Sequence, residues 1–123
     1  MPSTLEDLRV WQLAMDLIPT VYALAKTLPP EERYALGDQL RRAVISVAAN
    51  IAEGQARYQP KEFIQFLSIA KGSLAETETL LLAAVRLGYF PSAEVQIVRT
   101  QIDKIQALLD ALRASILKST GKR

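Results

Sequence analysis

Polar side chains recur along one side of a predicted helix in the middle of the chain, where the residues between them are small or apolar. Ser73 and Glu76 interrupt the apolar stripe of the next predicted helix in the same manner. A carboxylate or a guanidinium in apolar surroundings needs a partner, because an unpaired buried charge is costly. We therefore expect a structural polar seam that fixes the register between helices or subunits, formed by Gln39, Arg41, Arg42, Ser46, Asn50, Glu53, Ser73 and Glu76.

Our hypothesis for this seam is an ion pair supported by neutral polar groups. One of two adjacent arginines, Arg41 or Arg42, pairs with a carboxylate, either that of Glu53 or that of Glu76. The remaining hydrogen bonds are filled by Ser46, Asn50 and Ser73. Pairing within one subunit and pairing between subunits both stay open. The rival interpretation is a pocket for a ligand or a metal ion that uses Glu53, Glu76 and Glu78.

The chain contains neither histidine nor cysteine. Their absence removes the usual zinc ligands, the Glu-x-x-His pairs of di-iron bundles and every nucleophile that histidine activates. No Asp-rich loop for Ca²⁺ or Mg²⁺ is present, and the glycines form neither a phosphate-binding loop nor a dinucleotide fingerprint. We expect no catalytic, cofactor-binding or metal-binding residue, and acid–base chemistry by paired carboxylates stays a distant alternative.

A basic cluster that includes one tyrosine falls at the predicted turn between the second and third helices, at Arg57, Tyr58 and Lys61. A tyrosine between cations can stack a base while the cations hold phosphate, so these three are candidate nucleic-acid contacts. The alternative is an ordinary solvated helix junction. A second basic group lies in the last residues of the sequence: Lys118, Lys122 and Arg123. The net charge of only +2 favours protein association over nucleic-acid binding, because dedicated nucleic-acid binders usually have a larger, clustered excess.

Apolar residues recur at steps of three and four in four segments, which predicts helices over about residues 5–28, 31–57, 60–87 and 92–118. Residues 119–123 are expected to form a polar tail. Pro19 lies inside the first pattern and removes a backbone hydrogen bond, so we expect a kink or a helix in two parts. Short joints between long helices predict an all-α fold, an antiparallel up-down-up-down four-helix bundle that forms one domain over residues 1–123.

The first and third predicted helices carry apolar faces that are wider than a single bundle can cover, because each has two neighbouring apolar stripes. The excess implies that copies of the chain associate. The alternative is that the large side chains curl into the core of their own bundle. The candidate interface residues are Trp11, Met15, Tyr22, Phe63 and Phe66.

The composition is that of a folded protein, since half of the 123 residues are hydrophobic and 23% are charged. The longest uncharged run, Ala43 to Ala52, has ten residues, whereas roughly 20 are needed to span a bilayer. We expect no membrane segment and a cytoplasmic protein.

The run from Leu36 to Gly54 contains a specific pattern, Gln-Leu-Arg-Arg followed by Asn-Ile-Ala-Glu-Gly. This run resembles the signature of the four-helix-bundle family of 23S rRNA-intervening-sequence proteins. The resemblance extends in order over about residues 5–115 and includes Val10-Trp11-Gln12, the segment from Phe66 to Glu76, and Leu87-Gly88-Tyr89. It implies an up-down bundle that assembles as a ring, typically a homopentamer, with no catalytic residue to carry over. The chain lacks the mid-helix proline common in the family and has Val47-Ala48-Ala49-Asn50 there, so we expect a straighter second helix.

The resemblance also bears on function. Some members of the family are encoded within insertions in bacterial large-subunit ribosomal RNA genes. A related group acts as accessory proteins of diversity-generating retroelements, where a basic pentamer binds RNA or DNA and the reverse transcriptase. This implies a non-enzymatic homo-oligomer associated with RNA, although the mild net charge departs from the retroelement proteins. The alternative is a protein–protein interaction scaffold, or a reverse-transcriptase accessory, without strong nucleic-acid binding of its own.

Overall fold

The computed structural model describes residues 4–120 and is built from helices. The four long helices are α1 (Arg9–Ala25), α2 (Leu36–Ala56), α3 (Pro60–Arg86) and α4 (Ser92–Thr120). Two short 3₁₀ helices precede the first two of them, η1 (Leu5–Asp7) and η2 (Pro30–Glu32). The predicted all-α class and the number of long helices are confirmed.

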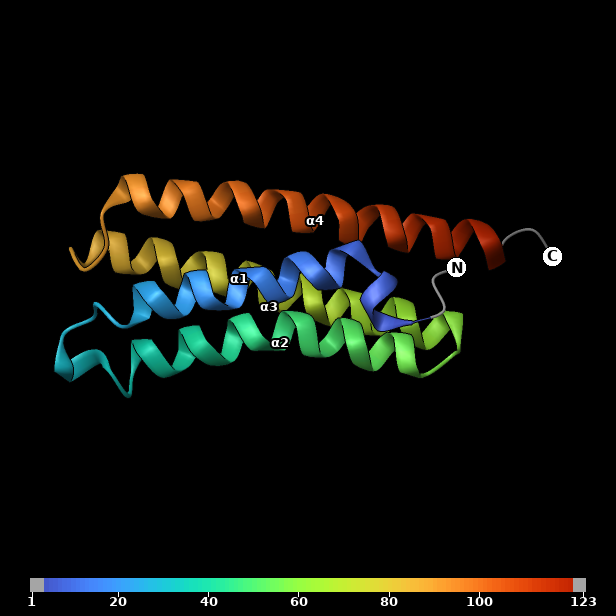
Figure 1. The fold of residues 1–123 in the computed structure, drawn as a ribbon, viewed down its shortest axis with the longest axis horizontal. Coiled ribbons are helices and arrows are strands. Elements are labelled where there is room, and N and C mark those ends of the chain that lie inside the picture. The colour runs from blue at the N-terminus through green and yellow to red at the C-terminus, as the bar shows by residue number, and fades with distance from the viewer. Residues whose placement is uncertain (1–3, 121–123) are drawn as a thin grey trace.

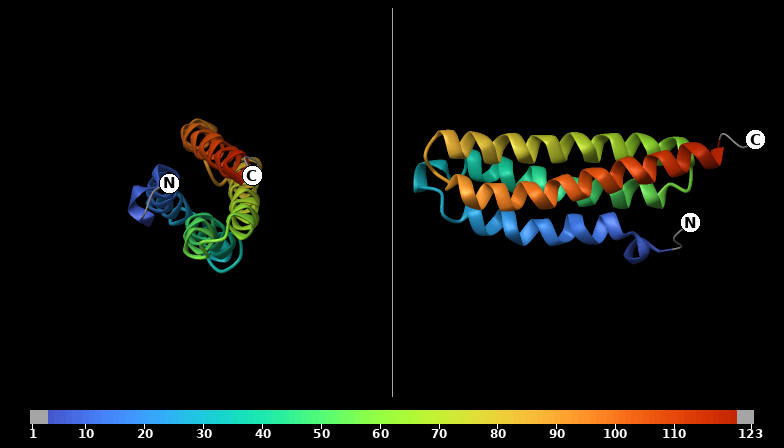
Figure 2. Two further views of the ribbon diagram at one scale, coloured as in Figure 1. Left: turned by 90° about the vertical axis from the view of Figure 1, so that its right-hand side faces the viewer. Right: turned by 90° about the horizontal axis from the view of Figure 1, so that it is seen from above.

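The long helices run alternately up and down along the bundle (Figure 1). Seen along its axis, they follow one another in chain order around a shared interior (Figure 2), and the main contacts join α1 to α2, α2 to α3, α3 to α4 and α4 to α1. The packing is most extensive between α2 and α3 and least extensive between α1 and α4. The arrangement is that of an up-down bundle.

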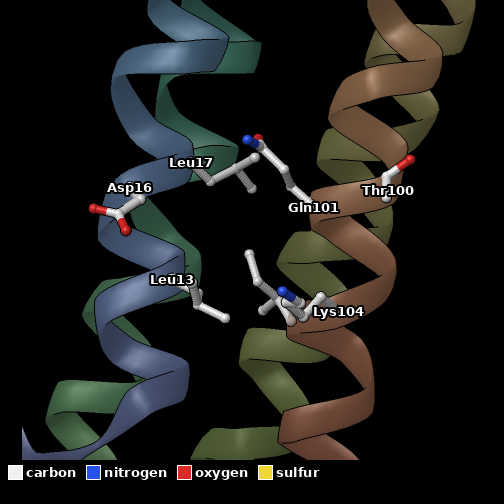
Figure 3. A pocket seen from close by; sticks show the side chains of 7 residues that line it. Leu13, Asp16, Leu17, Thr100, Gln101 and Lys104 are labelled. Carbon is white, nitrogen blue, oxygen red and sulfur yellow. The ribbon is translucent and has the colours of Figure 1, made fainter.

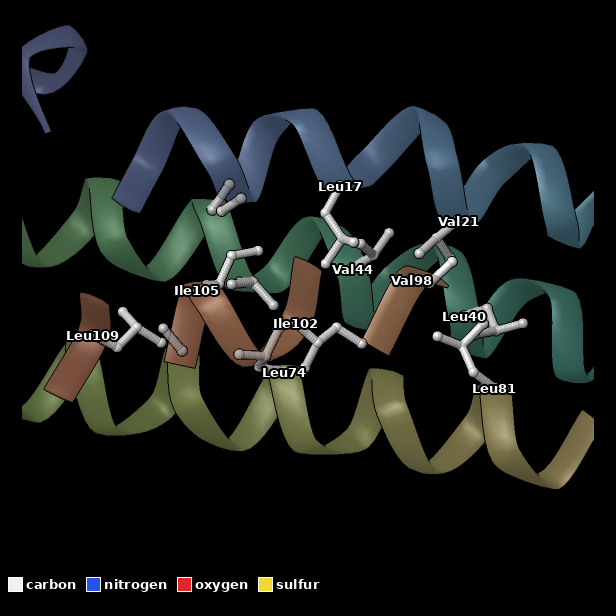
Figure 4. Packing of buried hydrophobic residues seen from close by; sticks show 14 of the residues in the cluster. Leu17, Val21, Leu40, Val44, Leu74, Leu81, Val98, Ile102, Ile105 and Leu109 are labelled. Atoms are coloured by element: carbon white, nitrogen blue, oxygen red, sulfur yellow. The ribbon is translucent and has the colours of Figure 1, made fainter. Parts of the chain in front are cut away.

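Aliphatic side chains from all four helices fill the interior (Figure 4). Leu17 of α1, Val44 of α2, Leu74 of α3 and Ile102 of α4 are all buried in one cluster. Each helix supplies such residues at steps of three and four, as its periodicity predicts. Burying one apolar stripe per helix is therefore what holds the four helices together.

The first helix is shorter than predicted at both ends. It begins at Arg9, because Leu8 adopts an extended conformation and buries its side chain in the core. It ends at Ala25 because Pro29 disfavours a helical conformation at Leu28, and the turn is closed by the Thr27 hydroxyl, which donates to the carbonyl oxygen of Leu24 at 2.7 Å. Between these ends α1 runs through Pro19 as one helix, so the expectation of two separate parts is wrong.

The second helix begins at Leu36 rather than at residue 31. Glu31 and Glu32 belong to η2, in which the backbone N–H of Glu32 donates to the carbonyl oxygen of Pro29. The turn after η2 is held by Arg41, whose guanidinium donates to the carbonyl oxygen of Arg33 at 2.7 Å. Ala35 has a non-helical conformation (φ −112°, ψ −96°), and this separates the turn from α2.

The other boundaries lie close to their predicted positions. The fourth helix continues to Thr120, two residues beyond its predicted end, while residues 121–123 of the predicted tail lie outside the described residues. The turn between α3 and α4 uses Gly88 in a left-handed conformation (φ 83°), which glycine adopts without steric cost. None of the helices within residues 4–120 combines the length and the apolar character that crossing a bilayer requires.

Candidate functional site

The neutral part of the predicted polar seam joins α2 to α3. The hydroxyl oxygens of Ser46 and Ser73 are 2.8 Å apart, and the Asn50 amide donates to the Ser46 hydroxyl at 2.9 Å and to its carbonyl oxygen at 2.8 Å. The Thr77 hydroxyl, one turn further along α3, is buried and donates to the carbonyl oxygen of Ser73. Each of these polar groups therefore has a hydrogen-bond partner, and the Ser46–Ser73 contact links α2 to α3.

The ion pair of the hypothesis is not formed within one chain over residues 4–120, and its formation between subunits stays a prediction. Arg41 pairs with Asp38, three residues before it, at 2.7 Å. Glu53 pairs with Arg57, four residues after it, at 3.2 Å. Arg42, Glu76 and Gln39 are exposed, and within residues 4–120 neither Arg42 nor Glu76 forms an ion pair.

Local pairing explains this outcome. Side chains three or four residues apart on a helix are neighbours, so Asp38 and Glu53 reach their arginines without leaving α2. Both ion pairs were predictable, because the spacings of three and four residues can be read directly from the sequence. The residue that pairs with Arg41 lies outside the predicted seam altogether.

The rival metal pocket finds no support in the side-chain positions. Glu53 is engaged by Arg57, and Glu78 accepts a hydrogen bond from Arg99 of α4 at 2.9 Å. Across the part of the chain that the structure describes, no group of three potential ligands converges. The carboxylates Glu53, Glu76 and Glu78 therefore do not form one site.

The aromatic ring and the two cations at the turn between α2 and α3 differ in their exposure and in their ion pairs. Tyr58 is 85% exposed and has a positive φ of 59°, which is uncommon for a residue other than glycine. Arg57 lies between two carboxylates, Glu53 and Glu62 (3.8 Å), and its guanidinium carbon is 5.1 Å from the centre of the Phe66 ring. Lys61 is exposed and has no ion pair within the described residues.

These contacts change the electrostatics of the predicted nucleic-acid cluster. Two nearby carboxylates offset the charge of Arg57, which leaves Lys61 as the cation free to meet a phosphate. Lys118 lies near the end of α4, at the same end of the bundle as this turn (Figures 1 and 2), whereas Lys122 and Arg123 lie outside the described residues. The turn alone is a weak anion site.

The candidate interface residues divide into three groups. Met15 and Tyr22 are 40% and 37% exposed on the outward side of α1, and Trp11 on the same stripe is half-buried. Phe66 is half-buried beneath Arg57. Phe63 is buried in the core of its own chain, so it offers no surface to a second copy. We refer to Trp11, Met15, Ile18 and Tyr22 as the outer α1 stripe.

Two apolar residues that are not among the predicted interface residues are also exposed, Ile45 of α2 and Ile69 of α3. Ile69 belongs to the second apolar stripe predicted for the third helix, whereas Ile45 lies outside the predicted stripes. A depression between α1 and α2 is lined by the apolar side chains of Tyr22, Ile45 and Ala49 and by Arg42. The apolar excess therefore extends from α1 across α2 to α3.

A separate pocket of about 230 Å³ lies between α1 and α4 (Figure 3). Leu13, Leu17 and Ile105 form its apolar part, and Asp16 and Lys104 stand at its edges without forming an ion pair. This pocket marks the side on which the bundle is least tightly closed.

Comparison with known proteins agrees with this geometry. The family model for the 23S rRNA-intervening sequence protein matches residues 6–111. The chain belongs to the 23S rRNA-intervening sequence protein family. The membership indicated by the run from Leu36 to Gly54 is thus confirmed.

A solved protein structure has the same fold as this chain. It is the crystal structure of a protein with unknown function from the S23 ribosomal protein family of Bacteroides thetaiotaomicron. The two chains are 24% identical and superpose with a TM-score of 0.78 over 85% of this chain and 97% of the other. None of the curated proteins compared with the chain matches it.

Proposed function

We propose that the chain is a non-enzymatic helical-bundle protein that works as a homo-oligomer, in the ring form, typically a pentamer, that the family resemblance implies. One observation carries the proposal: the outer α1 stripe leaves Met15 and Tyr22 exposed on one side of a single helix. Exposed apolar side chains gathered on one face mark an association surface. Covering them with a second copy removes that surface from water.

The mass of the purified protein in solution, measured by light scattering, tests the proposal. We expect a multiple of the 13.6 kDa chain mass, about 68 kDa for five copies. Met15→Glu combined with Tyr22→Glu introduces charge on the outer α1 stripe and is expected to give a monomer with unchanged helical content. The control is Ile97→Glu, at a more exposed apolar residue on α4 (66%), which is expected to leave the mass unchanged. A wild-type protein of 13.6 kDa at micromolar concentration contradicts the proposal.

RNA association is the second candidate function. Tyr58 supports it, because its side chain is 85% exposed and Lys61, three residues later, forms no ion pair within residues 4–120. Repetition of this turn in an oligomer multiplies a weak site, and the charge of +2 per chain adds up in the same way. The site then lies at the end of the bundle where α2 meets α3.

Binding of structured RNA at about 50 mM salt tests this candidate, with a steep loss expected as salt rises. Tyr58→Ala combined with Lys61→Ala is expected to weaken binding by about tenfold, since it removes one stacking ring and one phosphate contact. The control pair, Tyr34→Ala with Lys104→Ala, removes the same residue types elsewhere on the surface. No retention at low salt rejects RNA binding and leaves the protein-interaction scaffold, whose partners survive nuclease treatment in a pull-down.

A further inference from the structure

The pocket between α1 and α4 reaches the core of the bundle. Leu17 and Ile105, which are each only 1% exposed, form its inner wall together with the half-buried Leu13. Among the neighbouring helices of the bundle, α1 and α4 pack least extensively, and a space of about 230 Å³ remains between them. The inner part of this space therefore offers only aliphatic surface to a ligand.

The outer edge of the pocket carries polar side chains. In Figure 3, Gln101 and Lys104 reach from α4 toward α1, whereas the carboxylate of Asp16 points away from the pocket. Over the described residues, Lys104 forms no ion pair, and the side chain of Gln101 has no hydrogen-bond partner. An ammonium group and an amide are thus free to meet a ligand at this edge.

These two parts of the pocket define the chemistry of a fitting ligand. The aliphatic wall favours an alkyl chain, which loses its contact with water on entering. The ammonium of Lys104 and the amide N–H groups of Gln101 are donors, and a carboxylate accepts from both and carries the charge opposite to that of Lys104. A cavity of about 150 Å³ holds one benzene molecule, so a space of about 230 Å³ has room for a chain of about eight carbons.

We infer that the pocket between α1 and α4 binds a medium-chain aliphatic carboxylate. The alkyl chain lies against Leu13, Leu17 and Ile105, and the carboxylate lies at the outer edge, beside Lys104. The pocket is on the α4 side of α1, whereas Tyr22 of the outer α1 stripe lines the depression on the α2 side. Binding in the pocket therefore does not depend on the self-association proposed above.

Calorimetric titration of the purified protein with octanoate and with octylamine tests the inference, because the two probes share the chain and differ in the charge of the head group. We expect octanoate to bind with a Kd below about 1 mM and octylamine to bind at least about threefold more weakly. Lys104→Gln is expected to weaken octanoate binding by about threefold and to remove the preference over octylamine. Lys118→Gln, at another exposed lysine of α4, is the matched control and is expected to keep both.

A second variant tests the place of binding. Leu13→Trp puts a larger side chain into the apolar part of the pocket and is expected to weaken octanoate binding by at least about tenfold. Leu117→Trp makes the same change at an exposed residue of α4 outside the pocket and is expected to leave binding unchanged. Circular dichroism of each variant confirms that the helices are intact.

Three outcomes overturn the inference. The first is an absence of octanoate binding at millimolar concentration. The second is equal binding of octanoate and octylamine, or octanoate binding that Lys104→Gln leaves unchanged, because the pocket then does not select a carboxylate. The third is binding to the Met15→Glu/Tyr22→Glu monomer but not to wild type, which means that another copy covers the pocket. The mass of the wild type in solution is a separate measurement, so the proposed homo-oligomer stands or fails independently of these results.

Discussion

Gly54 of α2 lies close against the first turns of α3. A Cβ atom placed on it would lie 2.8 Å from the Cβ of Phe66 and 2.9 Å from a ring carbon of Phe63. Real Cβ atoms essentially never have such short contacts, so any side chain here forces the helices apart. The identity of this residue is thus set by packing across the helix pair.

We predict that Gly54→Ala lowers the free energy of unfolding by about 1–3 kcal/mol, because overpacking outweighs the higher helix propensity of alanine. Gly72→Ala is the matched control, since a Cβ at this α3 position meets nothing within 4 Å. It is expected to stabilise the protein by about 0.5–1 kcal/mol. Denaturant midpoints measure both changes, and a rise for Gly54→Ala rejects the packing argument.

At the scale of the residue, the structure contains the expected contacts among Ser46, Asn50 and Ser73 but not the expected ion pairs. The hydroxyl and amide groups of Ser46, Asn50 and Ser73 could be predicted to share bonds, because small polar residues on facing stripes have few other partners. The partner of Arg41 was not predictable from burial alone, since the choice between Asp38 and a distant carboxylate depends on how exposed α2 is at that point. Spacings of three and four residues were the better guide.

Among the elements, α1 is notable because it passes through Pro19 without a break. Proline at an interior helical position removes the hydrogen bond to the carbonyl four residues earlier and costs about 3 kcal/mol. The side chain is exposed, so the surrounding core does not depend on it.

We therefore predict that Pro19→Ala raises the free energy of unfolding by about 1–3 kcal/mol. This gain is smaller than the full cost of the proline, because alanine also gives the unfolded chain more conformational freedom. The measurement is the denaturant midpoint at unchanged slope. Since Pro19 lies beside Tyr22, the oligomer mass is measured in parallel. A lower midpoint contradicts the prediction.

The helix boundaries were predictable where they depend on local residues and not where they depend on distant ones. Pro60 at the start of α3 and Gly88 after its end act within one turn of the chain, and both boundaries agree with the prediction to within one residue. The start of α2 was predicted five residues too early because Glu31 and Glu32 are typical of a helix N-terminus. Glu31 and Glu32 instead form a separate 3₁₀ turn, and the non-helical conformation of Ala35 that follows is not revealed by a local residue pattern.

Across the whole molecule, one contact ties together the two loops at the end of the bundle opposite the α2–α3 turn. The Tyr89 hydroxyl, in the turn between α3 and α4, donates to the Glu32 carboxylate of η2 at 3.0 Å. This hydrogen bond, burial, and the negative charges of Glu32 and Glu31 raise the pKa of Tyr89 above its ordinary value of 10.0. The folded protein therefore favours the neutral phenol.

The sign of the pH dependence follows directly. A raised pKa in the folded state means that the stabilisation is fully present below pH 10 and is lost as the pH rises through the higher folded-state pKa. We predict that Tyr89→Phe is less stable than wild type near neutral pH and loses less stability above pH 10. Thermal unfolding of both proteins near neutral pH and above pH 10 tests this. An equal loss of stability in wild type and Tyr89→Phe between the two conditions contradicts the prediction.

Helix α1 is attached to the rest of the bundle differently from its neighbours. Side-chain hydrogen bonds or ion pairs join α2 to α3 through Ser46 and Ser73, and α3 to α4 through Lys71 and Asp110 at 2.9 Å. Among the described residues no such bond joins α1 to α2 or to α4, so apolar contact alone holds it. Because apolar stabilisation weakens on cooling, the packing of α1 against its neighbours is expected to weaken at low temperature. Low temperature is therefore expected to loosen the helix that carries the outer α1 stripe, the surface through which copies are proposed to associate.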